Sequence, residues 1–320
     1  MHKVAFIGLG VMGGPMAARL ARAGMAVTGY DHDKVRCAQA RSDGVKVATS
    51  AKSAAASAEI VITMLPDPGT LTDVLTGTSG VLAAMSQQSL LIDMGTSGPD
   101  TVAIVAQEAG DRNIRMIDAP VGRPPSAARD GRLIIIAGGE EADLKQAVPL
   151  FEIMGEVTHH AGPLGSGARL KLINNYMSMV GMVMTAEALA AGRKAGLDRK
   201  VLVEVLSHTA AGRGQIIINF PGKVLAGDIA PDFPIRLGLK DLGLALDMGQ
   251  ELEAELVLGK AAQRTFVEAI ASGRGEQDCT ALLLFLEEAA GLAPSVASAP
   301  LAAYRTGAGD SRSNEHKGGK

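Results

Sequence analysis

The sequence contains no tryptophan, only two cysteines and 3% aromatic residues. So few aromatic side chains argue against a protein that stacks on the bases of single-stranded nucleic acids. Cys37 and Cys279 stand far apart and form no CxxC motif. We therefore interpret them as small apolar residues of a reduced compartment, not as disulfide or metal partners. His159 and His160 form an isolated pair, and no cluster of His, Asp and Glu has the spacing of metal ligands, so we predict no bound metal.

The sequence also lacks a strong excess of charge and any long apolar run. The formal net charge of the 320 residues is −3, which gives no electrostatic reason to expect a nucleic acid or an anionic membrane as partner. No apolar run reaches the roughly 18 residues that a membrane-spanning helix needs. A core strand begins almost at residue 1 and leaves no room for a signal peptide, so we expect a cytoplasmic protein.

Glycine, in contrast, is abundant and forms the first informative motif. Gly8, Gly10 and Gly13 follow the apolar run 4–7, which we predict to be a buried strand, and open the segment 11–23, which we predict to be a helix. In such a turn the first glycine allows the tight bend, the second lets backbone approach a pyrophosphate, and the third lets helix pack on strand. The free N–H groups and the dipole of the helix N-terminus favour the negative charge of phosphate. The motif therefore predicts a dinucleotide site.

Asp31 completes this motif. It ends the next apolar run, residues 27–30, about twenty residues after the glycines. An acid at the end of this strand can accept hydrogen bonds from both ribose hydroxyls of the adenosine half. Because its negative charge repels a 2′-phosphate, we predict NAD(H) as the cofactor in preference to NADP(H).

Short β-branched runs alternate with helical segments over the first 160 residues. This alternation predicts an α/β domain with a doubly wound, mostly parallel Rossmann sheet, in which ligands bind beyond the carboxyl ends of the strands. We therefore expect ligand contacts in the loops that follow predicted strands, at residues 65–66, 94–96 and 119–123. The further strands that we predict are residues 60–65, 90–93, 116–118, 133–137 and 157–159.

The pattern changes after the glycine-rich segment 162–167. Residues 168–195 contain no proline and few β-branched residues, which predicts a long connecting helix. Helical periodicity then continues, interrupted by predicted loops at 210–214 and 227–234. The last residues are polar and glycine-containing, which predicts disorder. We therefore predict a Rossmann domain over 1–162, an all-helical domain over 163–305 and a disordered tail over 306–320.

A polar stripe marks the connecting helix. Lys171, Asn174, Asn175 and Ser178 follow the spacing i, i+3, i+4 and i+7, so they lie on one helical face. They could line a cleft beside the cofactor, but an interdomain hydrogen-bond network or a solvated face would produce the same spacing. The rest of the helix is apolar, and we predict that it is packed between the domains; these residues are Leu170, Leu172, Ile173, Met177, Met179, Val180, Met182, Val183 and Met184.

Five segments of the chain resemble the β-hydroxyacid dehydrogenase family, which includes 3-hydroxyisobutyrate dehydrogenase. The resemblance implies a Rossmann domain, a helical second domain, a homodimer or homotetramer, and reversible hydride transfer between a nicotinamide cofactor and an alcohol near an acidic group. The family's catalytic lysine maps onto Lys171, its neighbouring amide onto Asn175 and its cofactor-side lysine onto Lys240. A lysine suits this chemistry because an ammonium can stabilise the carbonyl oxygen and donate its proton, and burial lowers its pKa. The matching segments are residues 6–20, 93–96, 118–131, 165–175 and 240–242.

The chain departs from the family where the substrate's acidic group binds. The usual Asp-Ala-Pro-Val-Ser-Gly-Gly is here Asp-Ala-Pro-Val-Gly-Arg-Pro, which places Gly122 and Arg123 at the anion. A guanidinium suits an oxyanion with several acceptors. Within the family, the chain most resembles reductases of a short sulfonated aldehyde. That resemblance implies that Arg123, Asn174, Asn175 and Ser178 hold the substrate, and that the cofactor is held by Val11, Met12, Asp31, Leu65 and Thr96.

Other functions stay open on the sequence alone. The same reaction could act on a carboxylate, such as 3-hydroxyisobutyrate or succinic semialdehyde/4-hydroxybutyrate, because residues 124–125 and 215–219 match the sulfonate pattern less well. A non-catalytic nicotinamide sensor could keep the fold. Imine reductases share the fold too, but they commonly lack a lysine at the position of Lys171. In every enzymatic case we expect a small anionic aldehyde or alcohol as substrate.

Overall fold

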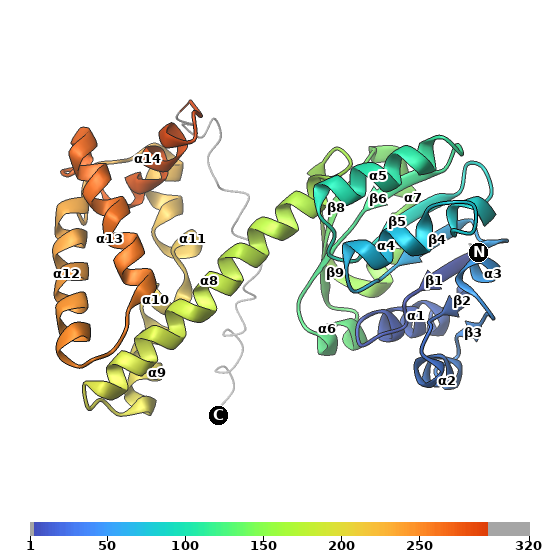
Figure 1. Cartoon of the computed structure of the whole chain (residues 1–320), viewed down its shortest axis with the longest axis horizontal. Helices are drawn as coiled ribbons and strands as arrows, with labels where there is room; N and C mark the ends of the chain where they lie inside the picture. The colour runs from blue at the N-terminus through green and yellow to red at the C-terminus, as the bar shows by residue number, and fades with distance from the viewer. Residues whose placement is uncertain (1–2, 294–320) are drawn as a thin grey trace, which may run out of the picture. The chain divides into compact units, whose positions relative to one another are not determined.

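The computed structural model describes residues 3–293 and forms two compact units, Met1–Ser178 and Met179–Lys320. The division falls inside the long helix α8, Ser166–Lys194 (Figure 1). Each unit is described below by itself. The predicted tail, residues 306–320, lies outside the described residues.

A twisted sheet forms the centre of the first unit (Figure 1). Its strands follow the order β3-β2-β1-β4-β5-β6-β8-β7, and β9 pairs with β8. The six strands from β3 to β6 are parallel, while β8 is antiparallel to β6 and β7. The predicted fold class, a mostly parallel Rossmann sheet, is thus confirmed. The strands are β1 (Lys3–Ile7), β2 (Ala26–Tyr30), β3 (Lys46–Val47), β4 (Ile60–Thr63), β5 (Leu90–Asp93), β6 (Arg115–Asp118), β7 (Val121–Gly122), β8 (Leu133–Gly138) and β9 (Gly155–Gly162).

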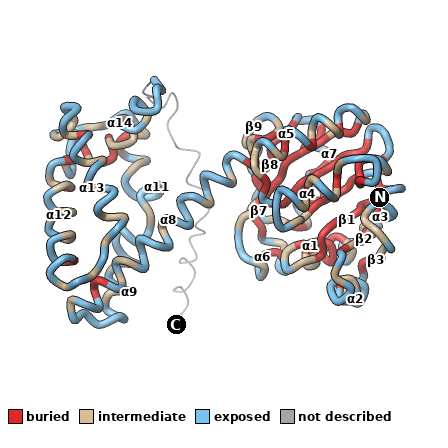
Figure 2. The backbone as a smooth tube through the Cα atoms, viewed as in Figure 1, coloured by how far each residue is buried: buried red, intermediate tan, exposed pale blue. Residues whose placement is uncertain are grey.

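Helices cover both faces of this sheet. Along β1, Val4 and Phe6 point into one core, while Ala5 and Ile7 point into the other, as the alternation of side chains along a strand requires. α1, α2, α6 and α7 contribute to the first core, and α3, α4 and α5 to the second. The strands are the most deeply buried part of the unit (Figure 2). The helices are α1 (Gly13–Arg22), α2 (Lys34–Ser42), α3 (Ala51–Ala55), α4 (Pro68–Leu75), η1 (Leu82–Ala84), α5 (Pro99–Gly110), α6 (Pro125–Asp130), α7 (Glu141–Met154) and the start of α8.

The strand order reverses between β1 and β4. β1 pairs with β2 on one side and with β4 on the other. At such a point the connecting segments leave in opposite directions and open a crevice beyond the carboxyl ends of the strands. The glycine turn after β1 and the loop after β4 therefore meet at this edge.

The observed strands differ from the predicted ones in several places, and β3 and β7 were not predicted. β4 ends at Thr63, two residues before the predicted end of this strand. β3 and β7 are strands of two residues, which are too short to produce a periodic pattern. β9 extends over eight residues instead of three, and most of its side chains are exposed. Pairing with β8 stabilises β9 over its whole length, although the sequence of β9 is polar. The sequence pattern therefore predicted too short a strand.

The second unit is helical. Its helices are α9 (Arg199–His208), α10 (Ala210–Arg213), α11 (Gln215–Ile218), η2 (Phe220–Gly222), η3 (Val224–Ala226), α12 (Ile235–Glu251), α13 (Val257–Ala269), η4 (Ile270–Arg274), η5 (Cys279–Ala281) and α14 (Leu282–Ala289).

The predicted loop at 210–214 was wrong, because residues Ala210–Arg213 form α10. Two alanines favour a helical turn, and Gly214, with a φ of 95°, ends it. The predicted loop at 227–234 contains no helix or strand element.

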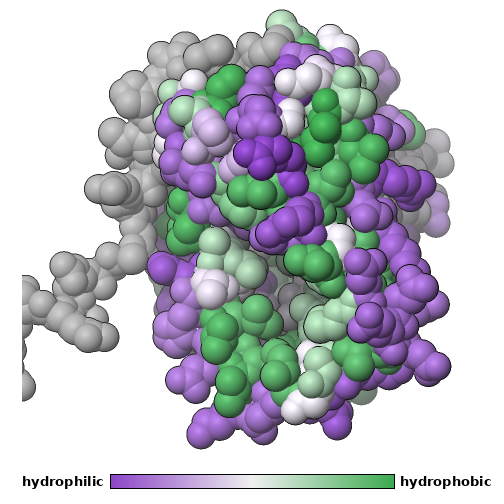
Figure 3. Space-filling model, turned by 90° about the vertical axis from the view of Figure 1, so that its left-hand side faces the viewer, coloured by the Kyte–Doolittle hydropathy of each residue, from purple (hydrophilic) through white to green (hydrophobic). Residues whose placement is uncertain are grey.

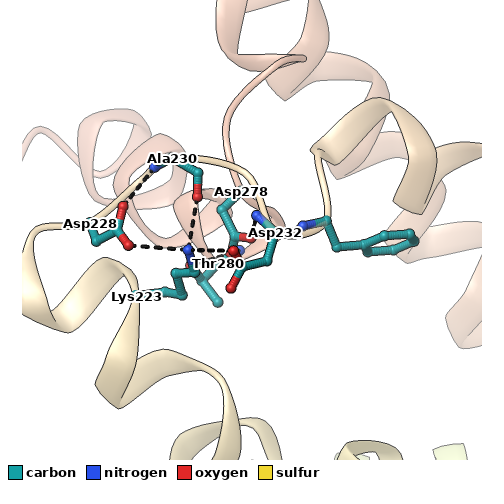
Figure 4. A network of polar contacts seen from close by, with 7 residues as sticks. Lys223, Asp228, Ala230, Asp232, Asp278 and Thr280 are labelled. Atoms are coloured by element: carbon teal, nitrogen blue, oxygen red, sulfur yellow. Dashed lines mark hydrogen bonds and ion pairs between the residues drawn. The ribbon is translucent and has the colours of Figure 1, made fainter.

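A polar network holds the loop before α12 (Figure 4). The Lys223 ammonium contacts the carboxylates of Asp228 and Asp232 at 3.1 and 3.0 Å and donates to the carbonyl of Ala230 at 3.0 Å. These partners raise the pKa of Lys223, chiefly through the Asp232 carboxylate. The buried Asp278 carboxylate accepts from backbone N–H groups of the same loop and caps η5. The network therefore fixes a loop that has no helix or strand to hold it in place.

The apolar residues of α8 are largely exposed in the described chain, and their packing between the domains stays a prediction. Ile173 is 58% exposed, Tyr176 68% and Met182 60%. The second unit also has a small core, in which Ile235, Ala269 and Ala281 form the buried cluster. Figure 3 shows hydrophobic residues exposed among hydrophilic ones on the side that it views. Much apolar surface is thus left uncovered by the described residues.

No helix among residues 3–293 has the length and apolar character needed to cross a membrane.

Candidate functional site

The glycine turn between β1 and α1 has the shape that the motif predicts. Gly8 has a φ of 95°, and a Cβ there would lie 2.3 Å from the carbonyl oxygen of Met64. A Cβ on Gly13 would lie 2.0 Å from the carbonyl oxygen of Gly8. At Gly10, by contrast, only the flexible end of Arg36 lies near, at 3.1 Å. The turn thus needs Gly8 and Gly13 for packing and leaves the space above Gly10 to a ligand.

The N-terminus of α1 has no side-chain cap, because the residue before its first turn is Met12. Within the turn, the Gly14 N–H donates to the Gly10 carbonyl at 2.9 Å. Val11 is 71% exposed, and Met12 packs partly against the core. Uncapped N–H groups at a helix N-terminus form an anion site. Both residues lie in the turn that a pyrophosphate would meet.

Asp31 follows β2 and is buried against the glycine turn. One carboxylate oxygen accepts from the backbone N–H of Leu9 at 2.7 Å, and the other accepts from the N–H of Asp33 at 2.9 Å. The Arg36 guanidinium lies 3.9 Å from the first oxygen, and His32 lies 3.3 Å from the second. These contacts fix the carboxylate at the edge where the ribose is expected.

The loops after β4 and β5 lie against the same edge. A Cβ on Gly8 would contact the Leu65 side chain at 3.2 Å, and a Cβ on Gly95 would contact the Leu65 carbonyl at 3.1 Å. Gly8, Leu65 and the loop that carries Thr96 therefore come together, as the sequence predicted for cofactor contacts.

Asp93 organises the loop that carries Thr96. Its carboxylate accepts from Thr63 Oγ1 at 2.8 Å, from Ser97 Oγ at 2.8 Å and from the Gly95 N–H at 3.1 Å. Burial raises the pKa of this carboxyl, which its hydrogen bonds oppose. Asp93 lies in one of the segments that resemble the family, but no role was predicted for it. Its position at the end of an apolar strand was the available signal.

The polar stripe lies on α8 as predicted. Lys171 and Asn175 are half-buried, and Asn174 and Ser178 are exposed. Asn174 Nδ2 donates to Asn175 Oδ1 at 3.3 Å. Partial burial lowers the pKa of the Lys171 ammonium. A lysine with a lowered pKa can exchange a proton nearer neutral pH, which suits a general acid or base.

Arg123 follows β7 in an unusual backbone conformation. Its φ is 79°, in the left-handed region that favours glycine. Its guanidinium forms an ion pair with Glu156 on β9 and donates to the carbonyl of Arg132 at 2.6 Å. Gly122 pairs with Ile134 in the sheet. The structure thus gives Arg123 protein partners that the sequence analysis missed, because Glu156 is 33 residues away and no pattern links the two.

Lys240 lies in the second unit, so it is not among the residues that the first unit brings together. It is exposed on α12, and its ammonium pairs with Asp241 at 2.8 Å. Its cofactor-side role stays a prediction.

No group of three or more His, Cys, Asp or Glu side chains among residues 3–293 could hold a metal ion. His160, instead, places Nε2 3.0 Å from the carbonyl of Gly139 and 2.9 Å from that of Gly162. Both cysteines are partly buried, and burial raises the pKa of Cys279 to about 11. A thiol with so high a pKa stays protonated and unreactive at neutral pH.

Comparison with known proteins matches both halves of the chain. Residues 3–162 match the NAD binding domain of 6-phosphogluconate dehydrogenase. Residues 165–286 match a family described as NAD-binding of NADP-dependent 3-hydroxyisobutyrate dehydrogenase. These matches establish a nicotinamide cofactor but do not distinguish NAD from NADP.

Relatives of known activity cover almost the whole chain. It is 38% identical to 3-sulfolactaldehyde reductase of Escherichia coli over 92% of this chain and 99% of that protein. It is also 38% identical to 3-hydroxyisobutyrate dehydrogenase of Pseudomonas aeruginosa, over 83% of this chain and 91% of that protein. Mycobacterium tuberculosis 3-hydroxyisobutyrate dehydrogenase, solved with L-serine, aligns with a TM-score of 0.63 and 32% identity over 89% of this chain and 99% of its own. The chain therefore belongs to the β-hydroxyacid dehydrogenase family, the nicotinamide-dependent oxidoreductases of CH–OH groups that include 3-hydroxyisobutyrate dehydrogenase.

Proposed function

We propose that this enzyme reduces 3-sulfolactaldehyde to 2,3-dihydroxypropane-1-sulfonate with NADH, in a reversible hydride transfer. One observation carries the proposal. At Arg123, where the family binds the acidic group of its substrate, a charged side chain occupies a backbone conformation that glycine would adopt without strain. The likeness to the Escherichia coli enzyme over nearly the full chain supports the same substrate.

Asp31 supports NADH as the physiological reductant. Its buried carboxylate is held at the end of β2 by the Leu9 and Asp33 N–H groups. A fixed negative charge there favours ribose hydroxyls and disfavours a 2′-phosphate. The glycine turn and the N-terminus of α1 would hold the pyrophosphate. When bound, the cofactor supplies the hydride.

Lys171 acts as the general acid of the reduction in this proposal. As hydride reaches the aldehyde carbon, the carbonyl oxygen gains negative charge and takes a proton from the Lys171 ammonium. Asn175, one turn further along α8, would hold that oxygen in place. In the reverse direction the neutral amine accepts the proton of the alcohol.

The lowered pKa of Lys171 fixes the sign of the pH dependence. Reduction needs the ammonium, so its rate falls as the pH rises through the pKa of Lys171, and burial moves this fall to lower pH. Alcohol oxidation needs the amine, so its rate rises over the same range.

The remaining polar residues would bind the rest of the substrate. Gly122 and Arg123 would bind the sulfonate, while Asn174 and Ser178 would bind the sulfonate and the diol from α8. An arginine offers several donors in a plane, which suits the three oxygens of a sulfonate.

A carboxylate substrate is the second candidate, and one observation favours it. Identity to the Pseudomonas aeruginosa 3-hydroxyisobutyrate dehydrogenase is also 38%. The test is kcat/KM of the purified enzyme for the reduction of 3-sulfolactaldehyde, of succinic semialdehyde and of the aldehyde that corresponds to 3-hydroxyisobutyrate, each with NADH and NADPH. The proposal expects the sulfonate to be preferred by at least about tenfold. A preference for either carboxylate would overturn it.

Lys171→Ala tests the mechanism. We expect it to lower kcat by about 10²- to 10⁴-fold, the usual contribution of a general acid, and to leave the Kd of NADH unchanged. The pH dependence of kcat that belongs to the lysine should disappear as well. Lys145→Ala is the matched control, because Lys145 is an exposed lysine of the first unit that pairs only with Glu141. Turnover near the wild-type value in Lys171→Ala would remove this residue from the mechanism.

A further inference from the structure

Asp118 joins the sheet to the start of α8. It ends β6, is 1% exposed, and uses both carboxylate oxygens on the helix. One oxygen accepts from the backbone N–H of Gly165 at 2.7 Å, and the other accepts from that of Ala168 at 2.6 Å. These N–H groups have no partner within the helix itself, because the first turn of a helix leaves its donors free. A residue 50 positions earlier in the chain thus caps α8.

Two glycines let the helix approach the sheet closely enough for this contact. A Cβ on Gly167 would lie 2.4 Å from the carbonyl oxygen of Ile136 and 2.9 Å from an Asp118 carboxylate oxygen. A Cβ on Gly138 would lie 2.5 Å from the other carboxylate oxygen and 2.8 Å from the Gly167 nitrogen. Ala168 is itself buried in the core between the sheet and its helices. The start of α8 is therefore fixed against the ends of β6 and β8.

Asp118 also lies next to the edge of the sheet where the cofactor is predicted to bind. Asp118 is the register partner of Asp93 across β5 and β6, and the Ala119 N–H donates to the Asp93 carbonyl at 2.6 Å. Asp93 holds the loop of Thr96 through Thr63, Ser97 and Gly95. Two neighbouring buried acids thus organise two different segments: Asp93 the loop predicted to touch the cofactor, and Asp118 the helix that carries the proposed acid.

We infer that Asp118 is a positioning residue that places Lys171 for proton transfer, by fixing the first turn of α8 against the ends of β6 and β8. This inference depends on the proposed role of Lys171. Ala168 and Lys171 are three residues apart, so they lie on the same face in adjacent turns. A shift of the first turn is therefore passed directly to the lysine. Misplacing a reacting group by about 1 Å can cost about 10²-fold in rate.

Asp118→Asn is the first test. The amide keeps the size of the side chain but replaces one acceptor by a donor, which faces a backbone N–H. We expect kcat to fall by about 10- to 100-fold while the Kd of NADH changes less than about threefold. Turnover is normalised to the fraction of protein that binds NADH, so partial unfolding does not imitate the effect. Asp143→Asn is the control, because Asp143 is another buried acid of the first unit, paired with Arg115 at the opposite end of β6. An unchanged normalised kcat in Asp118→Asn would overturn the inference.

A double-mutant cycle separates positioning from a general structural role. If Asp118 acts through Lys171, Asp118→Asn should have no further effect on the residual rate of Lys171→Ala. A full multiplicative loss in the double variant would show that Asp118 acts elsewhere. If Lys171→Ala alone keeps its activity, the proposed mechanism fails instead, so the two failures are distinguishable.

Gly167→Ala tests the same contact without touching the acid. Its Cβ would push the helix away from the Ile136 carbonyl and the Asp118 carboxylate. We expect the same pattern, a lower kcat with an unchanged Kd of NADH. Gly110→Ala is the control, because nothing lies within 4 Å of a Cβ at that position. Normal kcat in folded Gly167→Ala would contradict the inference.

Discussion

Arg123 has a protein partner, Glu156, with which an anionic substrate would compete under the proposed function. Its ion pair with Glu156 is partly exposed, since the side chains are 35% and 52% accessible. Arg123 lowers the pKa of Glu156, so this carboxylate stays charged at neutral pH and competes with the substrate. An exposed pair of this kind is worth little, and a substrate anion can displace it.

We predict that Glu156→Gln lowers KM for the sulfonated aldehyde several-fold, because it removes the competing charge, and leaves kcat unchanged. Steady-state kinetics of the variant measure this. Glu152→Gln, four residues earlier and on α7, is the control. An unchanged or raised KM in Glu156→Gln would indicate that Arg123 does not exchange Glu156 for the substrate.

At the residue scale, we propose that Asp31 and Arg36 together decide between NADH and NADPH. Asp31→Asn removes the charge that disfavours a 2′-phosphate and keeps the Arg36 guanidinium, which lies 3.9 Å from Asp31 and 3.5 Å from Asp33, near enough to bind one. We predict that the ratio of kcat/KM for NADPH over NADH rises at least about tenfold. Adding Arg36→Ala should cancel most of the gain.

The control for this change is Asp43→Asn. Asp43 carries the same charge at the C-terminal end of α2, and it pairs with Arg22. An equal change of cofactor preference in this control would mean that overall charge, not the position of Asp31, governs the choice.

The spacing of residues along the sequence predicted which residues form the candidate site, but it did not predict which of them contact one another. The glycines, Asp31 and the stripe from Lys171 to Ser178 lie where the motif and the helical period placed them. Asp118, Arg36 and Glu156 were assigned no role. The contacts of Asp118 and Glu156 join segments 33 to 50 residues apart, and sequence spacing contains no signal for such pairs.

At the scale of elements, two glycines of the turn have different roles. Gly13 allows α1 to pack closely, and Gly10 leaves space for a ligand. We predict that Gly13→Ala destabilises the cofactor-free protein by at least about 1–3 kcal/mol, because its Cβ would meet the Gly8 carbonyl. Gly10→Ala should keep the stability of the free protein, since only the Arg36 side chain has to move, but should raise the Kd of NADH at least about tenfold. Thermal unfolding and NADH titration measure the two effects.

The reverse result, a stable Gly13→Ala or an unstable Gly10→Ala, would show that the two glycines have been assigned the wrong roles.

Fully buried strands were the easiest elements to predict. β4 and β5 are apolar and buried at almost every position, so each gives an unbroken apolar run. β3 and β7, with two residues each, contain too little sequence to form any pattern. α10 was predicted to be a loop because of its glycine, although its alanines and its neighbours sustain one helical turn. Short elements depend on their surroundings, which composition does not describe.

At the scale of the whole molecule, the described residues leave many apolar side chains exposed. α8 exposes Ile173, Tyr176 and Met182, and the second unit has a buried cluster of only three residues. Exposed apolar patches of this kind mark interaction surfaces. We propose that a second copy of the chain covers them, in a homodimer or homotetramer.

Light scattering after size-exclusion chromatography tests this proposal. We predict twice or four times the mass of the chain for the wild type, and a smaller species for Met182→Glu, since a charge at an apolar interface is costly. Ile104→Glu is the control, because Ile104 is similarly exposed, at 55%, but lies on α5 of the first unit. A monomeric wild type, or an unchanged mass in Met182→Glu, would contradict the proposal.

The left-handed backbone at Arg123 has a consequence for attempts to engineer this enzyme. A glycine there would relieve about 1 kcal/mol of conformational strain. Thermal stability would therefore favour glycine at position 123, whereas the proposed recognition of the substrate anion requires arginine. A directed-evolution screen that rewards only thermal survival would favour glycine and would erode selectivity for the anion. Libraries built for hardier variants should therefore leave this position fixed.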